Sequence, residues 1–137
     1  MPAPIAAEDR FAVADLLARY CWFIDEGQAT EWAALFTDDG ALEGALAEPV
    51  RGTAALADFA ATLYRTNKGK SRHQFGNLWL EPGPDSNTLI ARFYNQISTW
   101  DGAETRLKGM ALSTATLRRD GAGEAWRMAV NVLDVRR

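Results

Sequence analysis

Three residues of this 137-residue chain have side chains that together could move a proton near neutral pH. His73 is the only histidine, and it begins a strand-like run that extends to Leu80. Asp25 and Tyr20 lie upstream, at the end of a segment with helical periodicity. An imidazole oriented by a carboxylate can act as a general base, and a phenol can donate a hydrogen bond to developing negative charge. Tyr20, Asp25 and His73 are therefore the candidate catalytic residues.

Each of these three residues also has a structural explanation. Tyr20 falls on the buried stripe of its helix, where it could be a core tyrosine with a satisfied hydroxyl. Asp25 could instead bind the backbone where the helix stops. His73 follows a polar stretch and could be the solvated end of a strand. A contact between Asp25 and His73 inside a pocket favours an enzyme, whereas a filled interior or an exposed His73 favours a small-molecule binding or dimerisation module.

Composition indicates one globular domain that spans residues 1–137. The hydrophobic fraction of 47% and the charged fraction of 24% are typical of a soluble protein. The net charge of −3 and the scattered basic residues exclude a typical nucleic-acid-binding protein. With a single cysteine and a single histidine, the chain has no disulfide framework and no zinc-binding pattern. We expect a cytoplasmic protein with no signal peptide, no membrane span, no metal and no cofactor.

The N-terminal half has helical periodicity. Between about residues 8 and 24, apolar side chains recur at steps of four, three and four, which predicts one buried helical stripe made of Val13, Leu17, Tyr20 and Ile24. Gly27 then stops the helix, and Thr30 is expected to cap a short second helix over residues 31–36. Residues 38–40 are predicted to form a turn and residues 41–46 a short strand. Thr53 is expected to cap a third helix, whose apolar face is Leu56, Phe59, Ala60 and Leu63.

Beyond Lys70 the period changes to two, which is typical of strands. Turn-forming segments at residues 82–87, 101–102 and 120–123 divide this region into four strands of an antiparallel meander. Strands this long in a small domain are expected to curl strongly. The predicted fold is α+β, a cone-shaped, strongly curved antiparallel sheet with three N-terminal helices that close its concave side.

Alternation along the strands indicates which side chains share the interior of the cone with His73. Phe75, Asn77 and Trp79 lie on the same face as His73 in a regular strand. Such a mixture of polar and aromatic groups suits a ligand cavity, although an outer face that contacts another subunit could have the same composition. In the second long strand the inward face is ambiguous. In the last strand, Asn131 stands among apolar neighbours, where it could bind a substrate oxygen or a backbone group.

A ligand for this cavity is predicted to be a small hydrophobic or ring-containing molecule. The candidate substrate-binding residues are Trp22, Phe36, Phe75, Asn77 and Asn131. The curved sheet also leaves an outer face to cover, so a homodimer or homotrimer is expected. Candidate exposed apolar residues for this contact are Met110, Leu112, Trp126 and Met128.

Three segments resemble the SnoaL-like branch of the nuclear-transport-factor-like superfamily. These are the helix end at residues 19–27, the segment at residues 32–40 and the strand start at residues 72–77. Within this branch, a tyrosine five residues before an aspartate, with a later strand histidine, resembles scytalone dehydratase, bile acid 7α-dehydratase and hexachlorocyclohexane dehydrochlorinase. The resemblance implies that Tyr20, Asp25 and His73 form the site and that the dyad acts as a base without a cofactor. Loss of water is then the expected reaction, with isomerisation and polyketide-type cyclisation as alternatives.

Overall fold

The structure is a computed structural model and describes residues 4–136. Within this range the chain forms three helices and six strands. Their order is α1 (Ala7–Asp25), α2 (Ala29–Ala33), β1 (Phe36–Glu43), β2 (Val50–Arg51), α3 (Thr53–Asn67), β3 (Ser71–Pro82), β4 (Thr88–Asp101), β5 (Glu104–Arg118) and β6 (Arg127–Arg136). The α+β prediction is confirmed.

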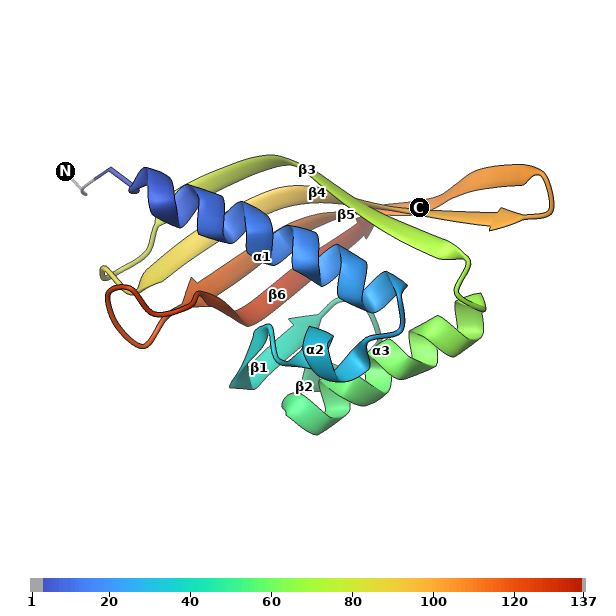
Figure 1. Cartoon of the computed structure of the whole chain (residues 1–137), viewed down its shortest axis with the longest axis horizontal. Coiled ribbons are helices and arrows are strands. Elements are labelled where there is room, and N and C mark those ends of the chain that lie inside the picture. Colours follow the sequence, from blue (N-terminus) through green and yellow to red (C-terminus); the bar gives the residue numbers. More distant parts are fainter. Residues whose placement is uncertain (1–3, 137) are drawn as a thin grey trace.

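The six strands form one curved sheet, and α1 lies across one face of it (Figure 1). The order of the strands is β2-β1-β6-β5-β4-β3. The four long strands, β3 to β6, form the predicted antiparallel meander. However, β1 pairs with β6 in parallel, so the whole sheet is mixed rather than purely antiparallel. The sheet is open, and the helices cover its concave side (Figure 1).

The predicted stripe of α1 is confirmed, because Val13, Leu17, Tyr20 and Ile24 are all buried. Gly27 follows the helix with a φ of 74°, a conformation that glycine adopts at little cost. Asp25 is the last residue of α1 and is also buried. The regular spacing of the apolar residues on α1 thus fixes which way Tyr20 and Asp25 face.

The short elements differ from the sequence prediction. Thr30 lies inside α2 rather than at its cap, which is Gln28, and Thr53 is the first residue of α3 after Gly52. Residues 38–40 belong to β1 and not to a turn. A β-bulge in β1 accommodates this segment beside β6, and any Cβ at Gly40 would meet Phe36 at 2.8 Å. Pairing with a distant strand therefore overrides the local turn signal of these residues.

A β-bulge in β3 changes which of its residues face the interior. The register with β4 shifts between Gly76 and Trp79, and Asn77 has a φ of 54°. An extra residue reverses the alternation beyond the bulge. Phe75 consequently packs against the core, whereas Asn77 and Trp79 are exposed. The prediction that Asn77 and Trp79 share an interior face with His73 is therefore wrong.

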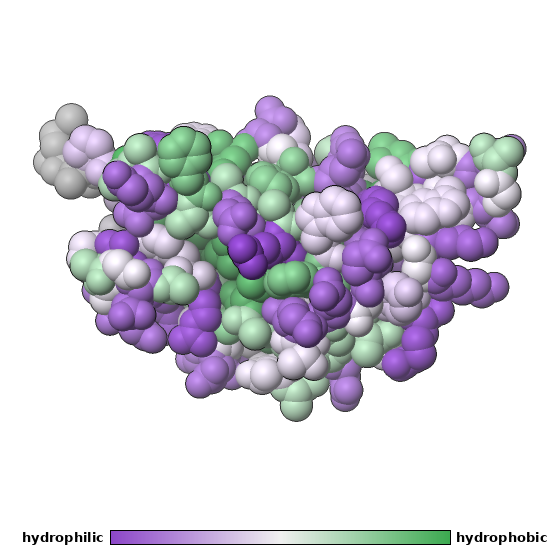
Figure 2. Space-filling view, in the orientation of Figure 1, coloured by the Kyte–Doolittle hydropathy of each residue, from purple (hydrophilic) through white to green (hydrophobic). Residues whose placement is uncertain are grey.

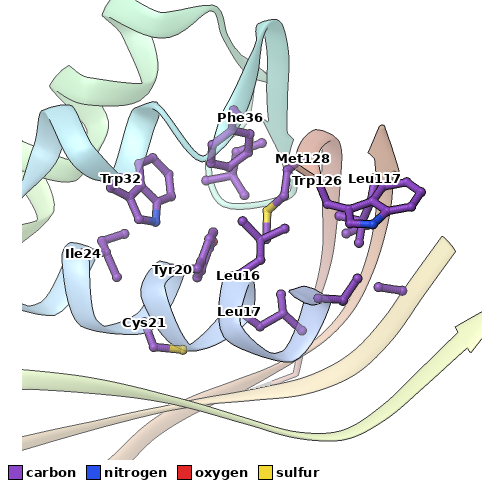
Figure 3. Packing of buried hydrophobic residues seen from close by; sticks show 14 of the residues in the cluster. Leu16, Leu17, Tyr20, Cys21, Ile24, Trp32, Phe36, Leu117, Trp126 and Met128 are labelled. Carbon is purple, nitrogen blue, oxygen red and sulfur yellow. The ribbon is translucent and has the colours of Figure 1, made fainter. Parts of the chain in front are cut away.

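A second bulge, where β6 pairs with β5, turns both Met128 and Asn131 inward. Trp126 and Met128 belong to the hydrophobic core, so the prediction that they form an exposed subunit contact is wrong. The core lies between α1, α2 and the sheet, with Trp32 and Phe36 beside Tyr20 (Figure 3). Homo-oligomerisation stays a prediction. No helix among residues 4–136 has the length and apolar character needed to cross a membrane.

Candidate active site

The end of α1 and the start of β3 bring Asp25 and His73 together, 48 positions apart in the sequence. Nδ1 of His73 lies 2.6 Å from Oδ1 of Asp25. The backbone N–H of His73 donates to the other carboxylate oxygen, Oδ2, at 2.7 Å. Both carboxylate oxygens therefore bind the same residue. The two contacts fix the rotamer of the imidazole and its tautomer, because a carboxylate can only accept and Nδ1 must carry the hydrogen.

Burial makes this contact strong. The side chains of His73 and Asp25 are only 6% and 3% exposed. Asp25 stands at the C-terminal end of α1, where the helix dipole disfavours a negative charge. The two hydrogen bonds to His73 offset that cost. Next to the dyad, Arg72 Nη2 donates to Glu26 Oε1 at 2.8 Å, so a more exposed ion pair also ties the same two chain segments together.

His73 also lines a cavity of about 510 Å³ between α1, α3 and the inner face of the sheet. Because Nδ1 is bound to Asp25, Nε2 is the ring nitrogen that is left to meet a ligand. The wall is mostly apolar, and the polar side chains on it are Tyr20, His73, Asn95 and Lys108. A cavity of this size, with few polar groups on apolar walls, is typical of a small-molecule site.

Tyr20 contributes a neutral phenol to the same cavity. Burial raises the pKa of its hydroxyl above the usual value, and the negative charge of Asp25 acts in the same direction. Nδ2 of the buried Asn131 donates to the Tyr20 hydroxyl at 3.5 Å. Since the phenol oxygen accepts this bond, its own hydrogen is free to be donated into the cavity. Asn131 thus positions Tyr20 and does not itself line the cavity wall described here.

Asn95 on β4 is the polar residue of the cavity with the clearest unmet requirement. It is 4% exposed, and its Oδ1 accepts no hydrogen bond from any residue between 4 and 136. A buried amide oxygen without a donor costs free energy. A ligand with a hydroxyl or amine group would supply that donor.

Leucine in place of Asn95 is expected to stabilise the folded protein by about 1 kcal/mol, because it removes a buried acceptor without a partner. The same change should weaken ligand binding and any activity, since the acceptor in the cavity is lost. Chemical denaturation and an activity assay measure the two effects. Asn131→Leu offers a contrast, because it likewise removes a buried oxygen without a donor but also removes the Nδ2 donor that the Tyr20 hydroxyl uses. A loss of stability in Asn95→Leu would contradict a ligand role for this amide.

A smaller pocket of about 290 Å³ at the dyad is lined by Cys21, Trp22, Asp25 and His73, together with Arg72 and Gln74. Burial raises the pKa of the Cys21 thiol to about 12, and the charge of Asp25 acts in the same direction. Cys21 is therefore a neutral thiol at physiological pH and a poor nucleophile.

The sequence-predicted residues divide into two groups. Asp25 and His73 are in contact, Tyr20 lies on the same cavity wall as His73, and Asn131 binds the hydroxyl of Tyr20. The other four candidates lie away from the described cavity wall. Trp22 is 64% exposed on α1, and Asn77 is exposed after the bulge. Phe36 and Phe75 pack into the hydrophobic core.

The sequence reasoning missed most of the cavity wall. Phe59 and Leu63 were recognised as one face of α3, but not as ligand-facing residues. Asn95 lies on the second long strand, for which the sequence did not indicate the inward face. Lys108 carried no signal of its own. The remaining wall residues come from α1, β1 and its following loop, β4, β5 and β6: Ile24, Leu42, Ala45, Leu46, Ile97, Gly109, Met110, Ala111, Leu133 and Val135. Among residues 4–136, no group of three or more His, Cys, Asp or Glu side chains is placed to hold a metal ion.

The strand order and the helix-covered curved sheet define the nuclear-transport-factor-like, cystatin-like fold. A solved protein from Novosphingobium aromaticivorans has this fold and is 23% identical, with a TM-score of 0.82 over 92% of this chain and 80% of that one. The sequence profile of the SnoaL-like domain matches residues 6–131. The chain therefore belongs to the SnoaL-like family, as the resemblance predicted.

Other solved structures agree with this assignment. Rv3472, a Mycobacterium tuberculosis protein of unknown function, is 26% identical, with a TM-score of 0.85 over 96% of this chain and 79% of that one. ActVI-ORFA from Streptomyces coelicolor is 20% identical, with a TM-score of 0.81 over 90% of this chain and 95% of that one. No curated protein matches the chain.

Proposed function

We propose that this protein is a cofactor-free lyase, a dehydratase, in which the Asp25–His73 dyad removes a carbon-bound proton from a hydrophobic, ring-containing substrate. The observation that carries the proposal is the buried contact of His73 Nδ1 with Asp25 at 2.6 Å, on the wall of a 510 Å³ cavity. The contact holds the imidazole as a base with its free nitrogen available to a ligand. The cavity removes the substrate from water, which strengthens each electrostatic interaction within it.

The proposed elimination acts on a β-hydroxy carbonyl compound. Nε2 of His73 takes the proton from the carbon next to the carbonyl, and the electron pair of that C–H bond forms an enolate. The Tyr20 hydroxyl donates a hydrogen bond to the enolate oxygen and keeps its proton, which stabilises the developing charge. The enolate then expels the β-hydroxyl, which leaves as water with the proton returned by the imidazolium. Asp25 stays ionised and stabilises the imidazolium while it exists.

The same dyad also supports isomerisation or cyclisation. If the imidazolium returns its proton to another carbon, a double bond shifts; if the enolate attacks a second carbonyl, a ring closes. These three outcomes share the first step, removal of a proton by His73. A binding module without activity is the remaining alternative, and it differs from all three in that His73 would make no contribution to a rate.

An elimination probe tests the shared first step without knowledge of the natural substrate. Nitrobenzisoxazole is a small apolar ring compound whose carbon-bound proton is removed by a base as its N–O bond breaks, which releases a coloured phenolate. We expect the protein to accelerate this reaction above an equal concentration of free imidazole. Diethyl pyrocarbonate, which acylates imidazole, should abolish the acceleration, and hydroxylamine should restore it. Because His73 is the only histidine, loss and recovery that follow its own acylation and deacylation in mass spectrometry would identify the base.

Two results would count against the proposal. One is a rate no higher than that of free imidazole. The other is an unchanged rate after mass spectrometry shows that His73 is fully acylated. Either result would favour the binding module.

A further inference from the structure

All three lysines of the sequence, Lys68, Lys70 and Lys108, line a single groove. They come from different elements. Lys68 follows the end of α3, Lys70 precedes β3, and Lys108 lies on β5. The groove has a volume of about 380 Å³, and its other lining residues are Asn67, Thr99, Trp100 and Asp101. Hydrophilic side chains gather where α3, β3 and the projecting β4–β5 hairpin meet, at the right of the view (Figure 2).

The lysine charges are not neutralised by neighbouring acids. Among residues 4–136, no carboxylate lies within 4.0 Å of a lysine ammonium group, whereas nine arginines form such ion pairs, from Arg19 to Arg136. Nζ of Lys108 donates instead to the neutral Oδ1 of Asn67 at 3.1 Å. Asp101 is the acidic side chain among the groove residues. Three ammonium groups against one carboxylate give the groove a positive potential that attracts anions.

Lys108 connects this groove to the candidate active site, because it lines both the groove and the apolar cavity. The cavity wall is therefore made mostly of apolar residues, with the neutral Tyr20 and Asn95, and Lys108 adds one positively charged residue to it. A molecule that fills the cavity meets His73 on one part of the wall and Lys108 on another, and Nζ of Lys108 lies beside Asn67 in the groove.

We propose that the ligand of this cavity carries an anionic group, of carboxylate, sulfonate or phosphate chemistry, which Lys108 binds with the support of Lys68 and Lys70. This inference rests on the proposed function only in taking the cavity as the ligand site. The anionic end stays in the groove, where water can still solvate it, and the apolar body enters the cavity. Such a ligand has one orientation, with its uncharged, reacting part toward His73.

A matched pair of fluorescent probes tests the proposal. Anilinonaphthalenesulfonate carries one negative charge, and phenylnaphthylamine is a neutral molecule of similar shape. We expect the sulfonate probe to bind the full-length protein more tightly, to be displaced by the neutral probe, and to weaken as salt rises. Lys108→Met should raise the Kd of the sulfonate probe by about 3- to 10-fold and leave that of the neutral probe within about 2-fold.

Arg92→Met is the control for net charge. Arg92 is an exposed cation on β4 that pairs with Glu81 and is absent from both the cavity wall and the groove among the described residues. It should leave both probes unchanged, and Lys68→Met and Lys70→Met should give smaller losses than Lys108→Met. The inference is overturned if Arg92→Met matches Lys108→Met, if Lys108→Met weakens both probes equally, or if neither probe binds.

The elimination assay separates this inference from the proposed function. A selective effect of Lys108→Met in a protein without His73-dependent elimination would uphold the anion site and reject the base. His73-dependent elimination with no preference for the sulfonate probe would do the reverse.

Discussion

Glutamine in place of His73 is expected to lower the rate of probe elimination by on the order of 10²- to 10³-fold, the contribution typical of a positioned general base. Glutamine keeps the backbone N–H that donates to Asp25 and fills a similar volume, but it has no basic nitrogen. The free energy of unfolding should therefore change little compared with the rate. Chemical denaturation checks the fold, and initial rates check the catalysis.

Asparagine in place of Asp25 tests how the base is oriented. The backbone N–H and Nδ1–H of His73 point at two different oxygens of Asp25, so in the same rotamer an amide would set its NH2 group against one of these two donors. We expect a loss on the order of 10²-fold, because part of the imidazole adopts the other tautomer. The nitrogen chemical shifts of the single imidazole report that tautomer by NMR. The double variant should be no slower than His73→Gln alone, since both residues act as one unit.

Two results would contradict the dyad. An Asp25→Asn variant with unchanged tautomer and rate would mean that the carboxylate does not orient the imidazole. Additive losses in the double variant would mean that the two residues act separately.

The contact between Asp25 and His73 was expected from the family resemblance, and local periodicity placed each partner at the end of a regular element. Four apolar side chains on α1 fix its buried stripe, and Asp25 follows that stripe at the helix end. His73 is near the start of β3 and precedes the β-bulge of that strand. Positions close to the end of a well-patterned element depend on local periodicity, which a single sequence contains.

The rest of the site depends on features that local periodicity does not contain. The bulge at Asn77 reverses the faces of β3, so a correct period led to a wrong face for Asn77 and Trp79. The position of the Lys108 side chain depends on its hydrogen bond to Asn67 at the end of α3, more than 30 residues earlier in the sequence. Asn95 was identifiable as a polar residue in an apolar strand, but only the pairing of β4 with β3 and β5 shows that it faces inward.

Alanine in place of Trp32 is expected to destabilise the protein by about 3–5 kcal/mol, the usual cost of truncating a fully buried tryptophan. Trp32 is completely buried near Phe36 and Tyr20 (Figure 3). Its ring centroid lies 5.0 Å from that of Phe36, 5.3 Å from that of Tyr20 and 6.0 Å from that of Phe59. Its short helix, α2, has five residues and depends on such packing for its stability. Thermal unfolding should show a Tm lower by roughly 10 °C or more.

Phenylalanine in place of Trp32 is the matched control, because it keeps an aromatic ring in the cluster. It also removes the indole N–H, a buried donor for which residues 4–136 supply no acceptor. We expect its loss of stability to be less than half that of Trp32→Ala, since the removed donor had no partner to lose. Tyr20 and Phe59 both line the cavity and both contact Trp32, so the alanine variant should also weaken binding of the neutral probe at temperatures where it is still folded. Equal losses of stability in the two variants would mean that the indole N–H has a partner, such as a buried water, and that the aromatic packing contributes less than its geometry indicates.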